Sequence, residues 1–176
     1  MTFDFSQSHF ALFAQPERFA LDLPALEARY RTLQGQYHPD RFASGSDAEK
    51  RLALQIATRV NEAYQVLRSP LARARYLLER AGVATQEETN TAMPVDFLMA
   101  QMQWREDIAE AKASRNVAQL EALAGALREE IGAQEALLGD QLDHNALEQA
   151  AVSVRKLRFL EKLDQDIGDA IEALLF

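Results

Sequence analysis

His38, Pro39 and Asp40 are the residues of this sequence whose types and spacing could support a reaction. An imidazole two residues from a carboxylate could act as a general base with an orienting acid. No serine, cysteine or metal-ligand motif accompanies the pair, and a tip between two helices is expected to be convex rather than a cleft. From the residues alone, a proline-containing turn whose Asp40 caps the chain locally is the better interpretation.

Two stretches with helical periodicity flank the tripeptide. Their apolar residues recur at intervals of three and four, the pattern of a helix with one buried face. The residues are Leu23, Leu26, Tyr30, Leu33 and Tyr37 before the tripeptide, and Leu52, Ile56, Val60, Ala63 and Leu67 after it. Pro39 ends the first helix because it disfavours the helical conformation at His38. The sequence therefore predicts an antiparallel helical hairpin with His-Pro-Asp at its tip.

Capping residues predict the other boundaries of this N-terminal unit. A short aromatic helix is expected near Phe10, and Asp22 is a plausible N-cap of the next helix. Ser46 and Glu49 have the spacing of a capping box, and Gly82 is expected to end a fourth helix that starts at Pro70. Residues 1–82 are therefore predicted to form one domain.

A polar linker over residues 83–93 is predicted to separate that domain from a second helical domain over residues 94–176. Asn116 is expected to cap the second helix of this domain, Gly139 to lie where that helix stops, and Asn145 to cap the third helix. Three long helices with short connections predict an antiparallel three-helix bundle. The expected fold class is all-α.

The helix that begins at Pro94 carries two apolar stripes rather than one. Phe97, Trp104, Ile108 and Ala111 fall on one line, with Ala100 beside them, and are sufficient to pack the helix into a bundle. Leu98, Met99, Met102 and Val95 lie well round from that line. A wide buried face could account for Leu98, but an adaptable protein-binding surface is the usual role of exposed methionines. Phe159 likewise lies off the apolar stripe of the last helix.

Composition excludes several classes of function. The formal net charge of −8 argues against a general nucleic-acid binder. The absence of cysteine excludes disulfides and thiolate ligation of a cluster, and neither His9 nor His144 has a partner spaced for metal binding. No apolar run reaches the roughly 20 residues that span a bilayer, and the N-terminal residues lack the features of a signal peptide. A cytoplasmic protein without a cofactor is the expectation.

The His-Pro-Asp tip between two amphipathic helices resembles a J domain over residues 8–80. The run HPDRFASGS from His38 to Ser46, together with VRKLRFLEKL from Val154 to Leu163, resembles the HscB family of co-chaperones. The resemblance spans nearly the whole chain. It implies a protein with no catalytic site of its own, which brings an IscU-type iron–sulfur scaffold to an HscA/DnaK-type ATPase chaperone.

The resemblance also implies two sets of site residues. The tripeptide would contact the chaperone ATPase, with Arg29, Arg31 and Arg41 on or beside the second helix as its basic neighbours. The scaffold would bind the C-terminal domain at the matching positions, which are Leu98, Met99, Met102, Gln103, Glu106 and Phe159. Gln103 stands where many relatives have Glu, so the charge at this position differs from the family pattern.

Three other functions remain open at this point. A J-domain protein that serves a general chaperone and other clients is the first, and the motif from Val154 to Leu163 argues against it. The second is an enzyme that uses His38 and Asp40, which would need turnover without a partner protein. The third is a helical adaptor without chaperone activity, which would leave an intact J domain unexplained.

Overall fold

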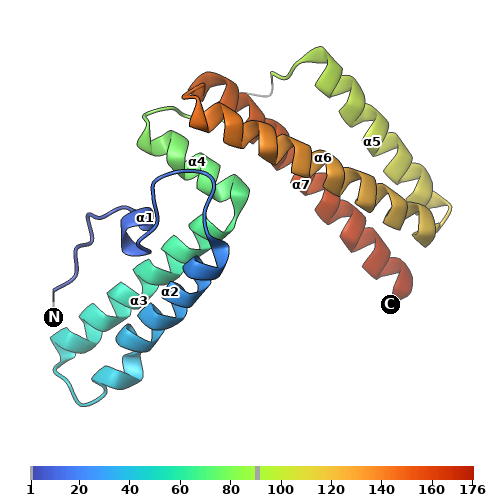
Figure 1. Ribbon diagram of the computed structural model, residues 1–176. Coiled ribbons are helices and arrows are strands. Elements are labelled where there is room, and N and C mark those ends of the chain that lie inside the picture. Colours follow the sequence, from blue (N-terminus) through green and yellow to red (C-terminus); the bar gives the residue numbers. More distant parts are fainter. Residues whose placement is uncertain (1, 90–91) are drawn as a thin grey trace. The chain divides into compact units, whose positions relative to one another are not determined.

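Helices account for all the regular structure in the described residues, which are 2–89 and 92–176 of a computed structural model (Figure 1). The elements are α1 (His9–Leu12), α2 (Leu23–Tyr37), the 3₁₀ turn η1 (Pro39–Phe42), α3 (Asp47–Arg68), α4 (Pro70–Arg80), α5 (Val95–Ala113), α6 (Val117–Asp143) and α7 (Leu147–Leu175). The chain divides into two units, Met1–Leu77 and Leu78–Phe176. Residues 90 and 91 of the predicted linker lie outside the described residues.

Helices α2 and α3 form the predicted antiparallel hairpin. The Asp22 side chain accepts a hydrogen bond from the Ala25 amide at 3.0 Å, and Pro24 occupies the first turn of α2, where a missing amide hydrogen costs nothing. The helix ends at Tyr37 because His38 is extended, with φ −62° and ψ 133°. This is the conformation that a following proline favours.

The core of the N-terminal unit joins the first three helices. Phe10 of α1 and Phe13, which follows α1, are buried together with Leu26 and Leu33 of α2. The α3 residues that pack against them are Ile56, Val60, Ala63 and Leu67. Leu23 was expected in this core, but it is 48% exposed because it is the first residue of α2 and lies beyond the end of the packed stripe.

Helix α3 starts with the predicted capping box. The Ser46 hydroxyl accepts from the Glu49 amide at 3.2 Å, and the Glu49 carboxylate accepts from the Ser46 amide at 2.8 Å. Two amide groups that would lack partners at a helix start are thereby satisfied. This cap fixes the point at which the tip loop re-enters the hairpin.

We expect Ser46→Ala to lower the free energy of unfolding by about 1 kcal/mol, since the substitution removes a helix N-cap. Ser44→Ala, two residues earlier in the exposed loop, is the control and should change it by about 0.5 kcal/mol or less. Urea unfolding of both variants measures the difference. Equal stabilities of the two variants would contradict a stabilising role for the cap.

The C-terminal unit is an antiparallel three-helix bundle, as predicted. Helices α6 and α7 run alongside each other in Figure 1, and α5 packs against both. The core contains Ile108 and Ala111 of α5 and Leu120, Ala124 and Leu127 of α6. From α7 it contains Leu160, Leu163, Ile167 and Ala170. Asn116 caps α6 by accepting from the Gln119 amide at 3.0 Å, which confirms its predicted role.

Two predicted boundaries in this unit are wrong. Helix α6 continues through Gly139 to Asp143, since one glycine costs only about 1 kcal/mol in a packed helix. Asn145 does not cap α7, whose N-cap residue is Ala146. Instead, Asn145 has φ +57° and ends α6, and the Ala146 amide donates to the Gln141 carbonyl at 2.8 Å. Asparagine tolerates this left-handed conformation, which is common at helix C-termini.

Candidate functional site

The His-Pro-Asp tip is held by a hydrogen bond within the tripeptide itself. His38 Nδ1 accepts from the Asp40 amide at 3.2 Å, which caps the 3₁₀ turn that begins at Pro39. Nδ1 uses its lone pair in this bond. Asp40 Oδ2 lies 3.6 Å from the same Nδ1, but this is not an ion pair while the imidazole is neutral.

Asp40 projects away from the protein. Its side chain is 92% exposed, against 58% for His38. The Arg41 guanidinium turns back instead, and its Nη1 donates to the Gly35 carbonyl at 3.1 Å. This bond satisfies a carbonyl in the last turn of α2, which would otherwise lack an intrahelical partner. The tip thus presents a carboxylate to a partner, while Arg41 fixes the tip to the helix that carries it.

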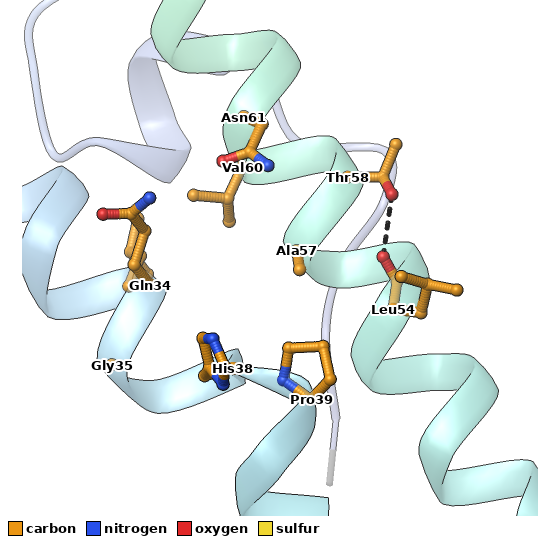
Figure 2. A pocket seen from close by; sticks show the side chains of 10 residues that line it. Gln34, Gly35, His38, Pro39, Leu54, Ala57, Thr58, Val60 and Asn61 are labelled. Carbon is orange, nitrogen blue, oxygen red and sulfur yellow. Dashed lines mark hydrogen bonds between the residues drawn. The ribbon is translucent and has the colours of Figure 1, made fainter.

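A groove of about 540 Å³ lies beside the tip, between α2 and α3 (Figure 2). Its lining includes Gly35, His38 and Pro39 from the end of α2 and the tip, and Leu54 and Thr58 from α3. The expectation of a purely convex tip is therefore wrong. The groove lacks a catalytic set, because Asp40 is not part of its lining and the Thr58 hydroxyl donates to the Leu54 carbonyl at 2.9 Å.

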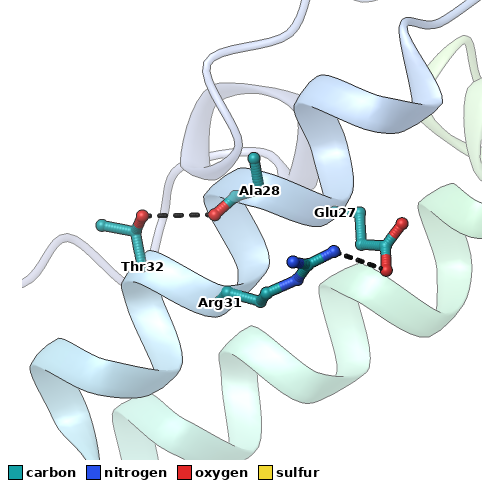
Figure 3. Close-up of polar contacts among 4 residues, drawn as sticks. All are labelled: Glu27, Ala28, Arg31 and Thr32. Carbon is teal, nitrogen blue, oxygen red and sulfur yellow. Dashed lines mark hydrogen bonds and ion pairs between the residues drawn. The ribbon is translucent and has the colours of Figure 1, made fainter.

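The arginines of α2 give a weaker positive face than their number suggests. Arg31 pairs with Glu27 one turn away, with Nη2 and Oε1 separated by 2.9 Å (Figure 3). Both side chains are largely exposed, so the pair contributes little to stability. Arg29 is half-buried and its Nε has no hydrogen-bond partner among the described residues. Arg41 is exposed, and its bond to Gly35 holds it against the end of α2.

The second apolar stripe of α5 lies on the surface, as predicted. Val95 is 71% exposed, Met99 66%, Met102 70% and Leu98 39%. We call these four residues the apolar patch. Helix α5 packs into the bundle through its opposite side, which carries Ile108, a residue that is only 6% exposed. Ala100 was predicted to lie beside the buried line of α5, but it is exposed. The neighbouring Gln101 is buried instead.

Polar side chains border the apolar patch along α5. Gln103 donates through Nε2 to Asp107 Oδ1 at 2.8 Å, so this amide is held by its own helix. Glu106 is exposed, one turn beyond Met102. A partner that covers the patch would therefore meet an apolar centre and a polar or acidic border, which is the usual organisation of a protein interface.

Phe159 packs inward, contrary to its prediction as a surface residue. It is half-buried against the C-terminal core, and its ring meets Phe97 of α5 edge to face at 6.3 Å between centroids. The Arg105 guanidinium lies 4.8 Å from the centre of the Phe159 ring. A helical wheel of α7 alone missed this packing because the neighbour that covers Phe159 belongs to another helix.

Phe159→Ala should consequently lower the free energy of unfolding by about 1–3 kcal/mol, because it removes half-buried apolar area and an aromatic pair. Thermal and urea unfolding would measure this loss. Phe176→Ala is a suitable control, since the Phe176 side chain is fully exposed. If the two variants were equally stable, Phe159 would have no packing role in the bundle.

The other histidines show no sign of metal chemistry. His9 is 7% exposed and stacks on Tyr76 with 4.4 Å between ring centroids, so it belongs to the core. His144 is exposed in the connection from α6 to α7. Among residues 2–89 and 92–176, no group of three or more potential ligands could hold a metal ion.

None of the described helices has the length and apolar character needed to cross a membrane.

Sequence reasoning did not predict the cations that contact the aromatic pair of Phe97 and Phe159. Lys156 Nζ lies 5.6 Å from the centre of the Phe97 ring, on the same pair that Arg105 contacts through Phe159. The adjacent Arg155 donates through Nη1 to the Thr85 carbonyl at 3.0 Å. No periodicity signals such contacts, because they join residues of different elements. The basic residues within VRKLRFLEKL were the only available hint.

Comparison with known proteins agrees with this arrangement. Residues 93–168 match the family model described as the HSCB C-terminal oligomerisation domain. The co-chaperone protein HscB homolog of Chromobacterium violaceum is 58% identical over 176 residues and 99% of each chain, and that of Burkholderia thailandensis is 54% identical over 95% of each.

Two solved structures share the fold over 96% of this chain. Chaperone HscB from Vibrio cholerae, covered over 99% of its length, has a TM-score of 0.85 and 34% identity. The human co-chaperone protein HscB, covered over 84%, has a TM-score of 0.89 and 27% identity. With its N-terminal J domain and C-terminal helical domain, the chain belongs to the HscB co-chaperone family.

Proposed function

We propose that this protein stimulates ATP hydrolysis by an HscA/DnaK-type chaperone and delivers an IscU-type iron–sulfur scaffold to it. The observation that carries the proposal is the presence of two separate contact features on one chain. One is the exposed His-Pro-Asp tip, and the other is the apolar patch on α5. A protein with both features can bind a client through one domain and act on an ATPase through the other.

The geometry of the tip supports a contact role rather than catalysis. His38 Nδ1 is occupied by the Asp40 amide, so this nitrogen is not free to act as a base. The Asp40 carboxylate is exposed and can pair with a cation on the ATPase. Pro39 fixes the backbone between them. The groove beside the tip offers apolar and amide groups that a partner could also contact.

The apolar patch supports client binding. Exposed methionines adapt to the shape of a partner, and a few apolar anchors usually dominate the affinity of an interface. The scaffold-binding residues proposed from the family resemblance are Leu98, Met99, Met102, Gln103, Glu106 and Phe159. All but Phe159 are exposed on α5, whereas Phe159 of α7 packs against Phe97 on the core side of α5.

The sequence supports a role in handling a scaffold rather than in holding a cluster. The chain has no cysteine, so any cluster would remain on the client protein. We place the protein in the cytoplasm and propose no membrane partner. We also propose no nucleic-acid partner, in line with the net charge of −8. A general J-domain protein that serves other clients is the alternative, and it would not need the specific affinity for the scaffold that we propose.

ATP turnover by the purified partner chaperone tests the proposal. The rate is measured for the chaperone alone, with this protein, with the scaffold, and with both. We expect a modest increase with this protein and a larger, more than additive increase with both. A rate that is independent of the scaffold, together with no binding between scaffold and protein, would favour the general J-domain alternative.

A further inference from the structure

We propose that a cationic groove beside the apolar patch receives a carboxylate side chain of the protein that covers the patch. The groove is lined by α5 and α7, has a volume of about 260 Å³ and is defined by Arg105, Ile108, Ala109, Lys112, Phe159, Lys162, Leu163 and Asp166. The proposal rests on the function proposed above and adds a chemical requirement for the client: an acidic residue next to its apolar contact.

The lining combines an apolar floor with a cationic rim. Ile108 and Leu163 are 6% and 4% exposed and form the floor, with Phe159 as one wall. Arg105, Lys112 and Lys162 are exposed around it. An aspartate or glutamate suits such a groove, because its methylene groups can contact the floor while its carboxylate meets the cations.

The cations of the groove have little internal compensation. Among the described residues that line the groove, Asp166 is the only acidic one. Among the described residues we find no ion pair for Lys112 or Lys162, and Arg105 is placed over the Phe159 ring rather than against a carboxylate. The groove therefore carries an excess of positive charge on a chain whose formal net charge is −8. Such a local reversal of sign favours an anionic partner group.

The groove is continuous with the apolar patch along α5. At about 100° per residue, Arg105, Ala109 and Lys112 lie on the same side of the helix as Leu98 and Met102. Glu106 and Glu110 lie on the other side of the patch. The patch thus has a cationic border on one flank and an acidic border on the other. Such an arrangement fixes the orientation of a docked protein, because the opposite orientation would bring like charges together.

The test uses the full chain with Lys112→Glu and Lys162→Glu combined, and the purified iron–sulfur scaffold as the probe. Scaffold affinity is measured by calorimetry at low and at physiological ionic strength (about 0.15 M). We expect the reversal to weaken binding about ten-fold at low ionic strength and less at the higher one, because exposed charges are screened. The variant Lys112→Arg with Lys162→Arg should bind like the wild type.

A matched control carries Lys50→Glu and Arg51→Glu, which change the net charge equally at the start of α3 in the other unit. Scaffold affinity should be unchanged in this control. Equal losses in the control and the groove variant would show an effect of net charge alone and would overturn the proposal. A groove variant that binds the scaffold normally would overturn it as well.

The same experiment separates this inference from the proposed function. If Met99→Ala with Met102→Ala abolishes scaffold binding while the groove variant binds normally, the groove inference is wrong and the proposed client surface stands. If neither variant changes the affinity, the scaffold binds elsewhere and both ideas are wrong. All the substituted side chains are exposed, so we expect the bundle to remain intact. Thermal unfolding of each variant checks this.

Discussion

His38→Gln is expected to reduce chaperone stimulation to the unstimulated rate of ATP hydrolysis while leaving the fold intact. The His38 side chain is 58% exposed, so its replacement should change the free energy of unfolding by about 0.5 kcal/mol or less. A glutamine oxygen can still accept a local hydrogen bond in place of Nδ1. The imidazole ring, with its second nitrogen Nε2, is lost. ATP turnover and thermal unfolding of the same preparation measure both effects.

His144→Gln is the matched control for this prediction. It makes the same chemical change at an exposed histidine between α6 and α7, whose Nδ1 contacts the Asp140 backbone carbonyl at 2.8 Å. We expect full stimulation from this variant. Full stimulation by a folded His38→Gln protein would contradict the role assigned to the tip.

Met99→Ala and Met102→Ala should each weaken scaffold binding by at least about ten-fold, since truncation of a dominant interface anchor costs about 2 kcal/mol or more. Both side chains are two-thirds exposed or more, so stability should change by about 0.5 kcal/mol or less. Truncation of a core methionine would instead cost about 2–5 kcal/mol. Stimulation of the chaperone without scaffold should survive both substitutions, because the tip is unchanged.

Leu137→Ala provides the control for a general loss of surface hydrophobicity. Leu137 is 46% exposed on α6 and does not belong to the apolar patch. Its truncation should leave scaffold affinity unchanged. A large loss of stability in the methionine variants with unchanged affinity would place these residues in the core and remove the proposed client surface.

The features that sequence reasoning predicted correctly depend on neighbours along the chain. Pro39 sets the conformation of His38, and the capping box of Ser46 and Glu49 spans only four residues. Gly82 has φ +78° where a helix was expected to stop. The two apolar stripes of α5 also follow from the spacing within one helix, and exposure of Met99 and Met102 confirms the surface stripe. Local rules suffice for these features.

The predictions that failed depend on contacts between elements. Phe159 was placed on the surface because a helical wheel contains no information about Phe97 of α5. Gly139 was expected to stop α6, but packing against α7 carries the helix past it. Asn145 fitted an N-cap by spacing, yet it occupies the left-handed position at the end of the preceding helix. In each case tertiary packing or an alternative cap overrode a valid local preference.

The same distinction applies to the candidate site. The family resemblance indicated its residues, but the structure shows that Arg41 turns back to Gly35 and that Arg31 pairs with Glu27. The first interaction fixes the position of Arg41, and the second places a negative charge beside Arg31. The groove beside the tip and the cationic groove beside the apolar patch could not be predicted, because each is lined by two different helices.

The most direct test of the central claim is a complementation measurement of ATP turnover in the presence of scaffold. The claim is that one chain must carry both the tip and the apolar patch, since only then is the bound scaffold brought to the chaperone. An equimolar mixture of the His38→Gln variant and the Met99→Ala, Met102→Ala double variant contains each feature on a separate chain. We predict that the mixture lacks the more than additive stimulation given by the wild type. Full wild-type stimulation by the mixture would contradict delivery by a single chain.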